Sequence, residues 1–147
     1  FKEDPVRALR AARQACELNF KINEDTVNLM RACKEEIKSE PQERIFNELQ
    51  RALKTKKPSV FFRSLVKADL LEILFPEIYA LIGKTQPVAF HPEGDAFEHT
   101  MEIVDLVAGM TDDVAVRFAG LVHHFCWLDE LLPTQVIVQV LVFTVQM

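Results

Sequence analysis

Hydrophobic residues along most of this chain recur every three or four positions, which is the period of an α-helix with one buried face. The pattern is clearest in one segment, whose apolar positions are Ile45, Phe46, Leu49 and Leu53. No segment before residue 135 shows the alternation of apolar and polar residues that is typical of a half-buried strand. Helix-forming residues fill the first half, and the chain holds only four glycines. The pattern predicts an all-α fold.

Breaks in this pattern predict where the helices begin and end. Asp4 is an N-cap type of residue, and Pro5 suits the first position of a helix, so we expect a first helix from here to about Asn19. The second helix is predicted to begin at Asp25. The later helices are expected after Pro41 and over residues 60–66, 70–74, 95–110 and 112–125.

The segment from residue 83 to residue 95 holds Pro87, Pro92 and Gly94 and is the best predicted linker. It divides the chain into an expected helical region over 1–84 and a second one over 85–147. The last twelve residues, VIVQVLVFTVQM, are rich in β-branched side chains and favour a strand, which conflicts with the helical remainder. A disordered or aggregation-prone tail and a strand that pairs with another chain both fit this ending.

Charge is distributed unevenly along the chain. Residues 1–57 hold 13 Lys and Arg against 10 Asp and Glu, a net +3, whereas residues 58–147 hold 4 against 12, a net −8. This imbalance indicates two roles, although the basic excess alone is weak evidence for nucleic-acid binding. Three widely spaced cysteines favour reduced thiols, and the apolar tail is too short to span a membrane. We expect a soluble, cytoplasmic protein.

The first helix carries candidate chemistry in the stretch EDPVRALRAAR, residues 3–13. A helix places Asp4 and Arg7 on the same side. A carboxylate accepts the amino hydrogen of cytosine or adenine, and a guanidinium donates to the neighbouring ring nitrogen, so the pair can accept C and A and reject U and G. Arg10 lies one turn further on and can meet a phosphate or a ring. An ordinary surface pair on a helix is the simpler interpretation of this spacing.

The same stretch resembles the EDxxR motif of the bacterial (class II) CCA-adding tRNA nucleotidyltransferases and their poly(A) polymerase relatives. Further segments resemble that family in the same order, over roughly residues 1–125: LNFKINEDTVNLM, ERIFNELQRAL, LFPEIYALIG and HPEGDAFEHT. The resemblance implies the helical neck and body of such an enzyme, with tRNA, CTP and ATP as its partners. It also implies that Asp4 and Arg7 select the nucleotide, that Arg10 contacts it, and that Glu3 holds the arrangement.

The resemblance also indicates what these 147 residues lack. The catalytic head of the family carries a Gly-Ser phosphate-binding motif and paired aspartates that hold two Mg²⁺ ions, and no such segment occurs in this sequence. Two-metal phosphoryl transfer requires those carboxylates. We therefore expect the Mg²⁺ site in a longer parent enzyme, and we expect this chain alone to add no nucleotides.

The segments HPEGDAFEHT and VRFAGLVHH resemble the start of an HD-type metal-dependent phosphohydrolase domain. The resemblance implies a divalent transition metal on His99, His123 and His124, although His124 stands where the pattern has an aspartate. Two alternatives to the transferase follow. One is an HD-type 2′,3′-cyclic phosphodiesterase or phosphatase, and the other is a non-catalytic helical module. Histidines at a helix C-terminus, stabilised by the helix dipole, are the simpler interpretation.

Overall fold

The computed structural model describes residues 1–85 and 94–123. In these residues the secondary structure is helical, and no strand is present apart from a single antiparallel bridge between Thr85 and Asp95. The elements are α1 (Val6–Leu18), α2 (Glu24–Ala32), the 3₁₀ helix η1 (Glu36–Ser39), α3 (Gln42–Leu53), α4 (Ser59–Lys67), α5 (Leu71–Leu74), α6 (Pro76–Tyr79), α7 (Ala96–Met110) and α8 (Val114–Val122). The predicted all-α class is confirmed.

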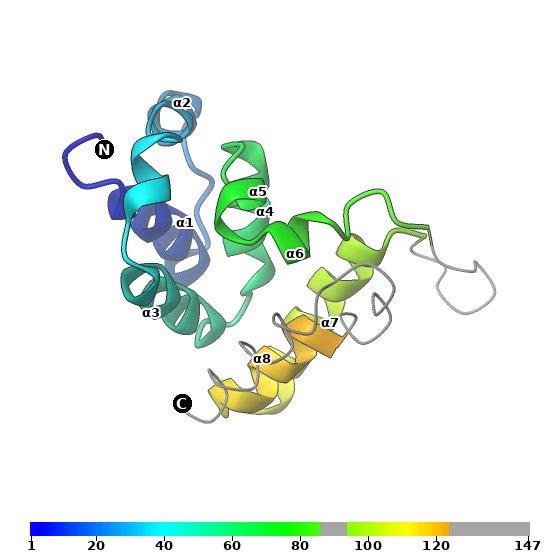
Figure 1. Cartoon of the computed structure of the whole chain (residues 1–147). Helices are drawn as coiled ribbons and strands as arrows, with labels where there is room; N and C mark the ends of the chain where they lie inside the picture. Colours follow the sequence, from blue (N-terminus) through cyan, green and yellow to red (C-terminus); the bar gives the residue numbers. More distant parts are fainter. Residues whose placement is uncertain (86–93, 124–147) are drawn as a thin grey trace.

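The helices pack as two groups that meet along α3 and α4. α1 packs against both α3 and α4, and α7 pairs with α8 on the other side of them (Figure 1). α4 contacts α7, and α3 contacts α8. The chain begins beside α1, so the EDxxR-like stretch lies at the end of the molecule remote from α7.

One apolar cluster runs through both groups. Its most deeply buried side chains include Leu9, Phe61, Phe62, Met101 and Leu121. The rings of Phe46 and Phe118 meet edge to face with their centroids 6.3 Å apart, which joins α3 to α8. Described residues on both sides of residue 84 therefore share a core, and the division of the chain at that residue stays a prediction.

Arg117 of α8 is a buried cation that ties the two groups together. It is 3% exposed, and its guanidinium donates to the carbonyls of Leu53, Thr55, Ala108 and Thr111 over 2.6 to 2.9 Å. A buried charge is tolerated only when its donors are satisfied. The carbonyls that accept from Arg117 lie at two turns, one after α3 and one after α7. These hydrogen bonds fix the turn between α3 and α4.

The starts of α7 and α8 agree with the sequence, because Asp95 and Asp113 cap these helices by accepting hydrogen bonds from first-turn amides. Asn19 ends α1 in the left-handed conformation (φ 54°), as expected. The second helix was predicted to begin at Asp25, and it begins one residue earlier, at Glu24. Asn23 caps this helix by accepting from the Asp25 amide over 2.8 Å, and Asp25 lies inside the first turn.

Several expectations lie outside the described residues. These are the middle of the predicted linker, the β-prone ending and the residues from Cys126 onward, which lie beyond the part of the chain that resembles the family. The other two cysteines, Cys16 and Cys33, are buried free thiols, and burial raises the pKa of both. The described part of the chain contains no helix that is both long enough and apolar enough to cross a membrane.

Candidate functional site

Asp4 lies just before α1, and arginines surround its carboxylate. Arg44 of α3 donates from Nη2 to Asp4 Oδ1 over 2.9 Å. On the other oxygen, Oδ2, the Nε of Arg7 lies at 3.9 Å and the Nη1 of Arg10 at 3.6 Å. The predicted trio of Asp4, Arg7 and Arg10 is therefore brought together, and Arg44 completes the cluster.

The sequence predicted Asp4 as the side-chain cap of α1, and the structure shows otherwise. The helix has no side-chain cap hydrogen bond, and the Asp4 main chain accepts from the Arg7 amide over 3.1 Å. A hydrogen bond between two charged groups is stronger than one from a neutral amide. The carboxylate accordingly turns toward the guanidinium of Arg44.

This environment sets the charge of Asp4. The hydrogen bond from Arg44 is the main cause that holds the pKa of the Asp4 carboxyl below its ordinary value, and the charges of Arg44, Arg10 and Arg7 act in the same direction. The same bond to Asp4 raises the pKa of Arg44, whose Nη1 also donates to Glu40 over 2.7 Å. At neutral pH the Asp4 carboxylate is ionised and can only accept hydrogen bonds.

Glu48 of α3 is a residue of this cluster that the sequence reasoning missed. It is 4% exposed, and its carboxylate accepts from Arg13 Nε over 2.7 Å while Arg10 Nε lies at 3.5 Å. Burial opposes the charge of Arg13, but its hydrogen bonds to Glu48 and Glu17 outweigh that effect and raise its pKa. The signal in the sequence was the position of Glu48 on the same helical face as Ile45 and Ala52.

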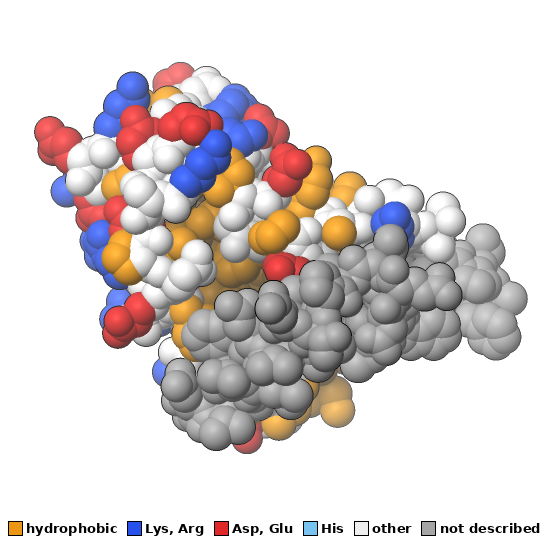
Figure 2. Space-filling model, viewed as in Figure 1, with side chains coloured by type: hydrophobic (Ala, Val, Ile, Leu, Met, Phe, Trp, Pro, Cys, Tyr) orange, Lys and Arg blue, Asp and Glu red, His pale blue; other side chains and the backbone are white. Residues whose placement is uncertain are grey.

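The edge formed by Asp4, Arg7 and Arg10 faces solvent. The Arg7 side chain is 62% exposed and that of Arg10 is 45% exposed, whereas Asp4 is 27% exposed. Charged side chains of both signs are interleaved over the helices on this side of the molecule (Figure 2). Glu3 is exposed beside Asp4, and its supporting role stays a prediction. A planar ligand can therefore approach Asp4 and Arg7 from solvent.

α1 and α3 lie side by side and run in the same direction, so residues near the start of one lie beside residues near the start of the other. Asp4 meets Arg44 at one end, Arg13 meets Glu48 further along, and Glu17 and Arg51 both line a hollow at the far end. The hollow has a volume of about 480 Å³, and its lining residues are Cys16, Glu17, Asn19, Arg51, Lys54, Thr55, Lys56 and Lys57. Paired acidic and cationic side chains thus follow one another between the Asp4 edge and this hollow.

The structure places two of the three predicted metal ligands side by side. The imidazole rings of His99 on α7 and His123 at the end of α8 have centroids 5.7 Å apart. His123 Nδ1 lies 2.6 Å from the Gly120 carbonyl, which can only accept, so this nitrogen donates. His124 lies outside the described residues, which hold no group of three or more potential ligands that could bind a metal.

Acidic residues near His99 on α7 bind α4. Asp105 accepts from the amide and the hydroxyl of Ser59 over 2.9 and 2.6 Å. Glu98 forms a two-bond pair with Arg63, and this pair raises the Arg63 pKa. These carboxylates hold α7 against α4 in the structure, and the metal site stays a prediction.

Comparison with known proteins places this helical, arginine-rich unit in a class. Residues 19–81 match the family described as "Probable RNA and SrmB- binding site of polymerase A". The chain is 44% identical over 128 residues to the Multifunctional CCA protein of Shewanella denitrificans. The matched region covers 84% of this chain and 31% of the relative. It is 41% identical over 133 residues to the Multifunctional CCA protein of Mannheimia succiniciproducens, covering 84% of this chain and 32% of that relative.

Residues 19–81 are thus similar to an RNA-binding unit of polymerase A type. The longer match shows that the chain is similar to part of two CCA proteins. The chain spans about a third of the length of the curated relatives that it matches. No solved structure matches it significantly.

Proposed function

We propose that this chain is the part of a CCA-adding tRNA nucleotidyltransferase that selects the incoming nucleotide by its base. The observation that carries the proposal is the solvent-facing edge of Asp4 and Arg7, in which an ionised carboxylate lies beside an exposed guanidinium. The matches to two Multifunctional CCA proteins support it, because the names of both relatives refer to CCA. In this proposal the partners are tRNA, CTP and ATP.

The proposed selection rests on hydrogen-bond polarity. Cytosine and adenine present an amino group beside a ring nitrogen that accepts. Asp4 accepts from the amino group, and Arg7 donates to the ring nitrogen. Uracil and guanine present a carbonyl beside an N–H, so they would set a carbonyl against the carboxylate and an N–H against the guanidinium. Unmatched polar groups of this kind are costly once water is excluded.

Arg44 and Glu48 prepare the edge for this role. Arg44 occupies Asp4 Oδ1, which leaves Oδ2 turned toward Arg7 and Arg10. Glu48 holds Arg13 at 2.7 Å and stands 3.5 Å from Arg10. A carboxylate has room for several donors on its two oxygens, so Oδ2 can accept from a base while the arginines stay in place.

Phosphoryl transfer itself is assigned to other parts of the proposed parent enzyme. In this proposal two Mg²⁺ ions bound there polarise the phosphates. Asp4, Arg7 and Arg10 bind and orient the base and take no part in the bond-making step. The HD-type phosphohydrolase remains the alternative, and its supporting observation is the proximity of His99 and His123.

The test uses the parent enzyme with Asp4→Ala or Arg7→Ala, together with Arg31→Ala as a control on an exposed arginine of α2. A good bidentate base contact is worth roughly 1–3 kcal/mol, so each edge variant should lose about tenfold or more of the preference for CTP and ATP over UTP and GTP. Competition assays of incorporation into tRNA measure this ratio. An unchanged ratio in both edge variants would contradict the assignment.

A further inference from the structure

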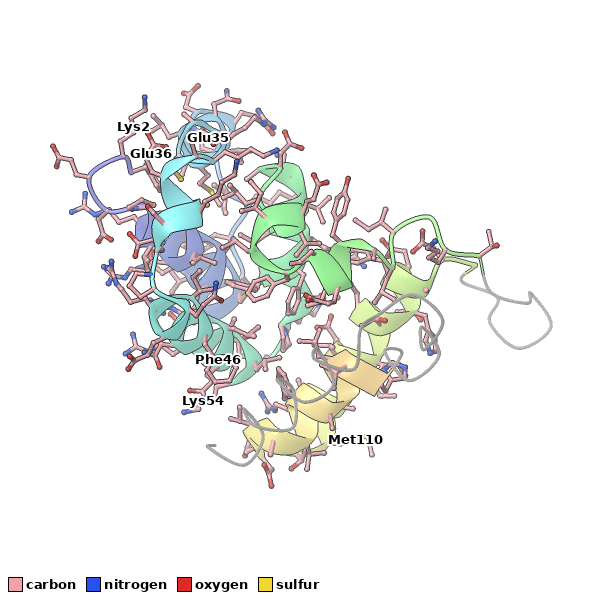
Figure 3. The ribbon with its side chains drawn as sticks, in the orientation of Figure 1. Lys2, Glu35, Glu36, Phe46, Lys54 and Met110 are labelled. Atoms are coloured by element: carbon pink, nitrogen blue, oxygen red, sulfur yellow. The ribbon has the colours of Figure 1, made fainter. Side chains whose placement is uncertain are left out.

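The hollow at the far end of α1 and α3 is bounded by cations, most of which form no salt bridge with a described residue. Lys54, Lys56 and Lys57 are exposed, and no salt bridge among the described residues includes them. Arg51 lies 4.0 Å from Glu48, at the limit of an ion pair. Lys54 extends outward from the end of α3 (Figure 3). The other arginines of α1 and α3, by contrast, are engaged with Asp4, Glu40, Glu48 or Glu17.

The remaining lining of the hollow offers little negative charge. Its one acidic side chain, Glu17, accepts from Arg13 over 2.6 Å. Burial raises the pKa of the Cys16 thiol to about 12, so this side chain is neutral at physiological pH. The helix dipole favours a cation at the end of α3 and accounts for Lys54. It does not account for Lys56 and Lys57, which lie beyond the helix.

The backbone that carries these lysines is held in place. Arg117 donates to the carbonyls of Leu53 and Thr55 over 2.6 and 2.9 Å, on either side of Lys54. The Thr55 hydroxyl donates to the Ala52 carbonyl over 2.7 Å. The turn therefore presents its lysines from a fixed backbone, which lowers the ordering cost of binding a ligand.

An exposed aromatic ring adds a second feature at this end of the molecule. Phe20 is 68% exposed, and it directly follows Asn19, which lines the hollow. Proteins that bind single-stranded nucleic acid combine a positive groove for the backbone with aromatic faces on which bases stack. The match to an RNA-binding family also covers residues 19–81, which include Phe20 and all three lysines.

We propose that Arg51, Lys54, Lys56 and Lys57 bind phosphate groups of a single-stranded RNA segment, with Phe20 as a stacking face for one of its bases. This site is distinct from the Asp4 edge but lies on the same pair of helices. The inference rests on the proposed tRNA-handling function. The same cations could bind the triphosphate of a free nucleotide. The experiment distinguishes RNA from a free nucleotide as the source of the bound phosphate groups.

The experiment measures binding of a fluorescein-labelled RNA hairpin with a single-stranded 3′ end to the chain as a function of salt. The variant K54Q/K56Q/K57Q is compared with K38Q/K67Q/K84Q, which removes three exposed lysines from other elements. Each phosphate contact contributes about 0.7 to the salt slope for single strands, so the first variant should lower the slope by about 2. The second should leave it unchanged. Thermal unfolding monitored by circular dichroism confirms that both variants are folded.

Phe20→Ala should weaken RNA binding about tenfold without changing the salt slope, and Phe20→Tyr should restore it. Leu29→Ala, at another exposed apolar residue, should have no effect. Equal salt slopes in the two lysine variants would overturn the proposal. A failure of the unsubstituted chain to bind the RNA would overturn it as well. A loss of tripolyphosphate binding with RNA binding retained would overturn it in favour of a nucleotide triphosphate. Base selection, measured separately on the Asp4 and Arg7 variants, reports on the proposed function.

Discussion

At the scale of single residues, the long-range partners decide what each charged group does. Asp4 is a helix-cap residue by type, but Arg44, forty positions later, takes its carboxylate. Glu48 is an ordinary polar residue in the sequence, yet it is buried against Arg13. Sequence spacing predicted that Asp4, Arg7 and Arg10 lie together, because Asp4 directly precedes the helix that carries the two arginines. It could not predict partners from α3, since these depend on how α1 and α3 pack.

Glu48→Ala should destabilise the chain by about 3 kcal/mol, because removing one member of a buried ion pair leaves the other charge without its partner. Arg13 is the side chain most affected, since only 12% of it is exposed. Urea denaturation followed by circular dichroism measures the change. Glu17→Ala removes the other, more exposed partner of Arg13 and should cost less than about 1 kcal/mol. Equal losses in the two variants would show that Glu48 does not anchor the cluster.

At the scale of elements, the apolar period predicted the long helices of the described residues, whereas their ends depended on capping. The helices expected from residues 95 and 112 are capped by Asp95 and Asp113, and each of these is the last residue of a capping type before the apolar run. At α2 the sequence offers both Asn23 and Asp25, and periodicity does not choose between them. The extended backbone at Asn23 (φ −61°, ψ 146°) lets its side chain reach the Asp25 amide.

Asn23→Ala should destabilise the chain by about 1 kcal/mol, because the first turn of α2 loses its side-chain acceptor. Asn23→Asp keeps an acceptor at the same position and adds a charge that the helix dipole favours, so this variant should be as stable as the unsubstituted chain. Chemical denaturation compares the three proteins. If the alanine and aspartate variants were equally stable, the cap would contribute nothing.

At the scale of the whole molecule, the apolar cluster and Arg117 join α7 and α8 to the first six helices. The turn after α3 and the turn between α7 and α8 are built around the same guanidinium. The local sequence near Arg117 does not indicate that it joins the two turns, because two of its acceptors, the carbonyls of Leu53 and Thr55, lie more than sixty residues away in the chain. The family resemblance supplied the candidate functions, and the arrangement of α1 against α3 supplies the geometry that supports one of them.

The chain alone, incubated with tRNA, CTP, ATP and Mg²⁺, should add no nucleotides to the tRNA 3′ end. Its sequence holds no aspartate pair flanked by predicted strands and no glycine-rich loop, the features of the family's catalytic head on which two-metal transfer depends. Gel electrophoresis of radiolabelled tRNA detects an addition of a single residue, and a CCA-adding enzyme of full length serves as the positive control. Any incorporation by the chain would show that it carries its own catalytic metal site.

The central claim is that Arg7 donates to the ring nitrogen of the incoming base while Asp4 accepts from the amino group. The most direct measurement compares incorporation of ATP with that of 1-deaza-ATP, which lacks the N1 acceptor, in the parent enzyme and in its Arg7→Ala variant. We predict that the parent enzyme prefers ATP by about tenfold or more and that the variant has no preference. An equal preference in both enzymes would contradict the account.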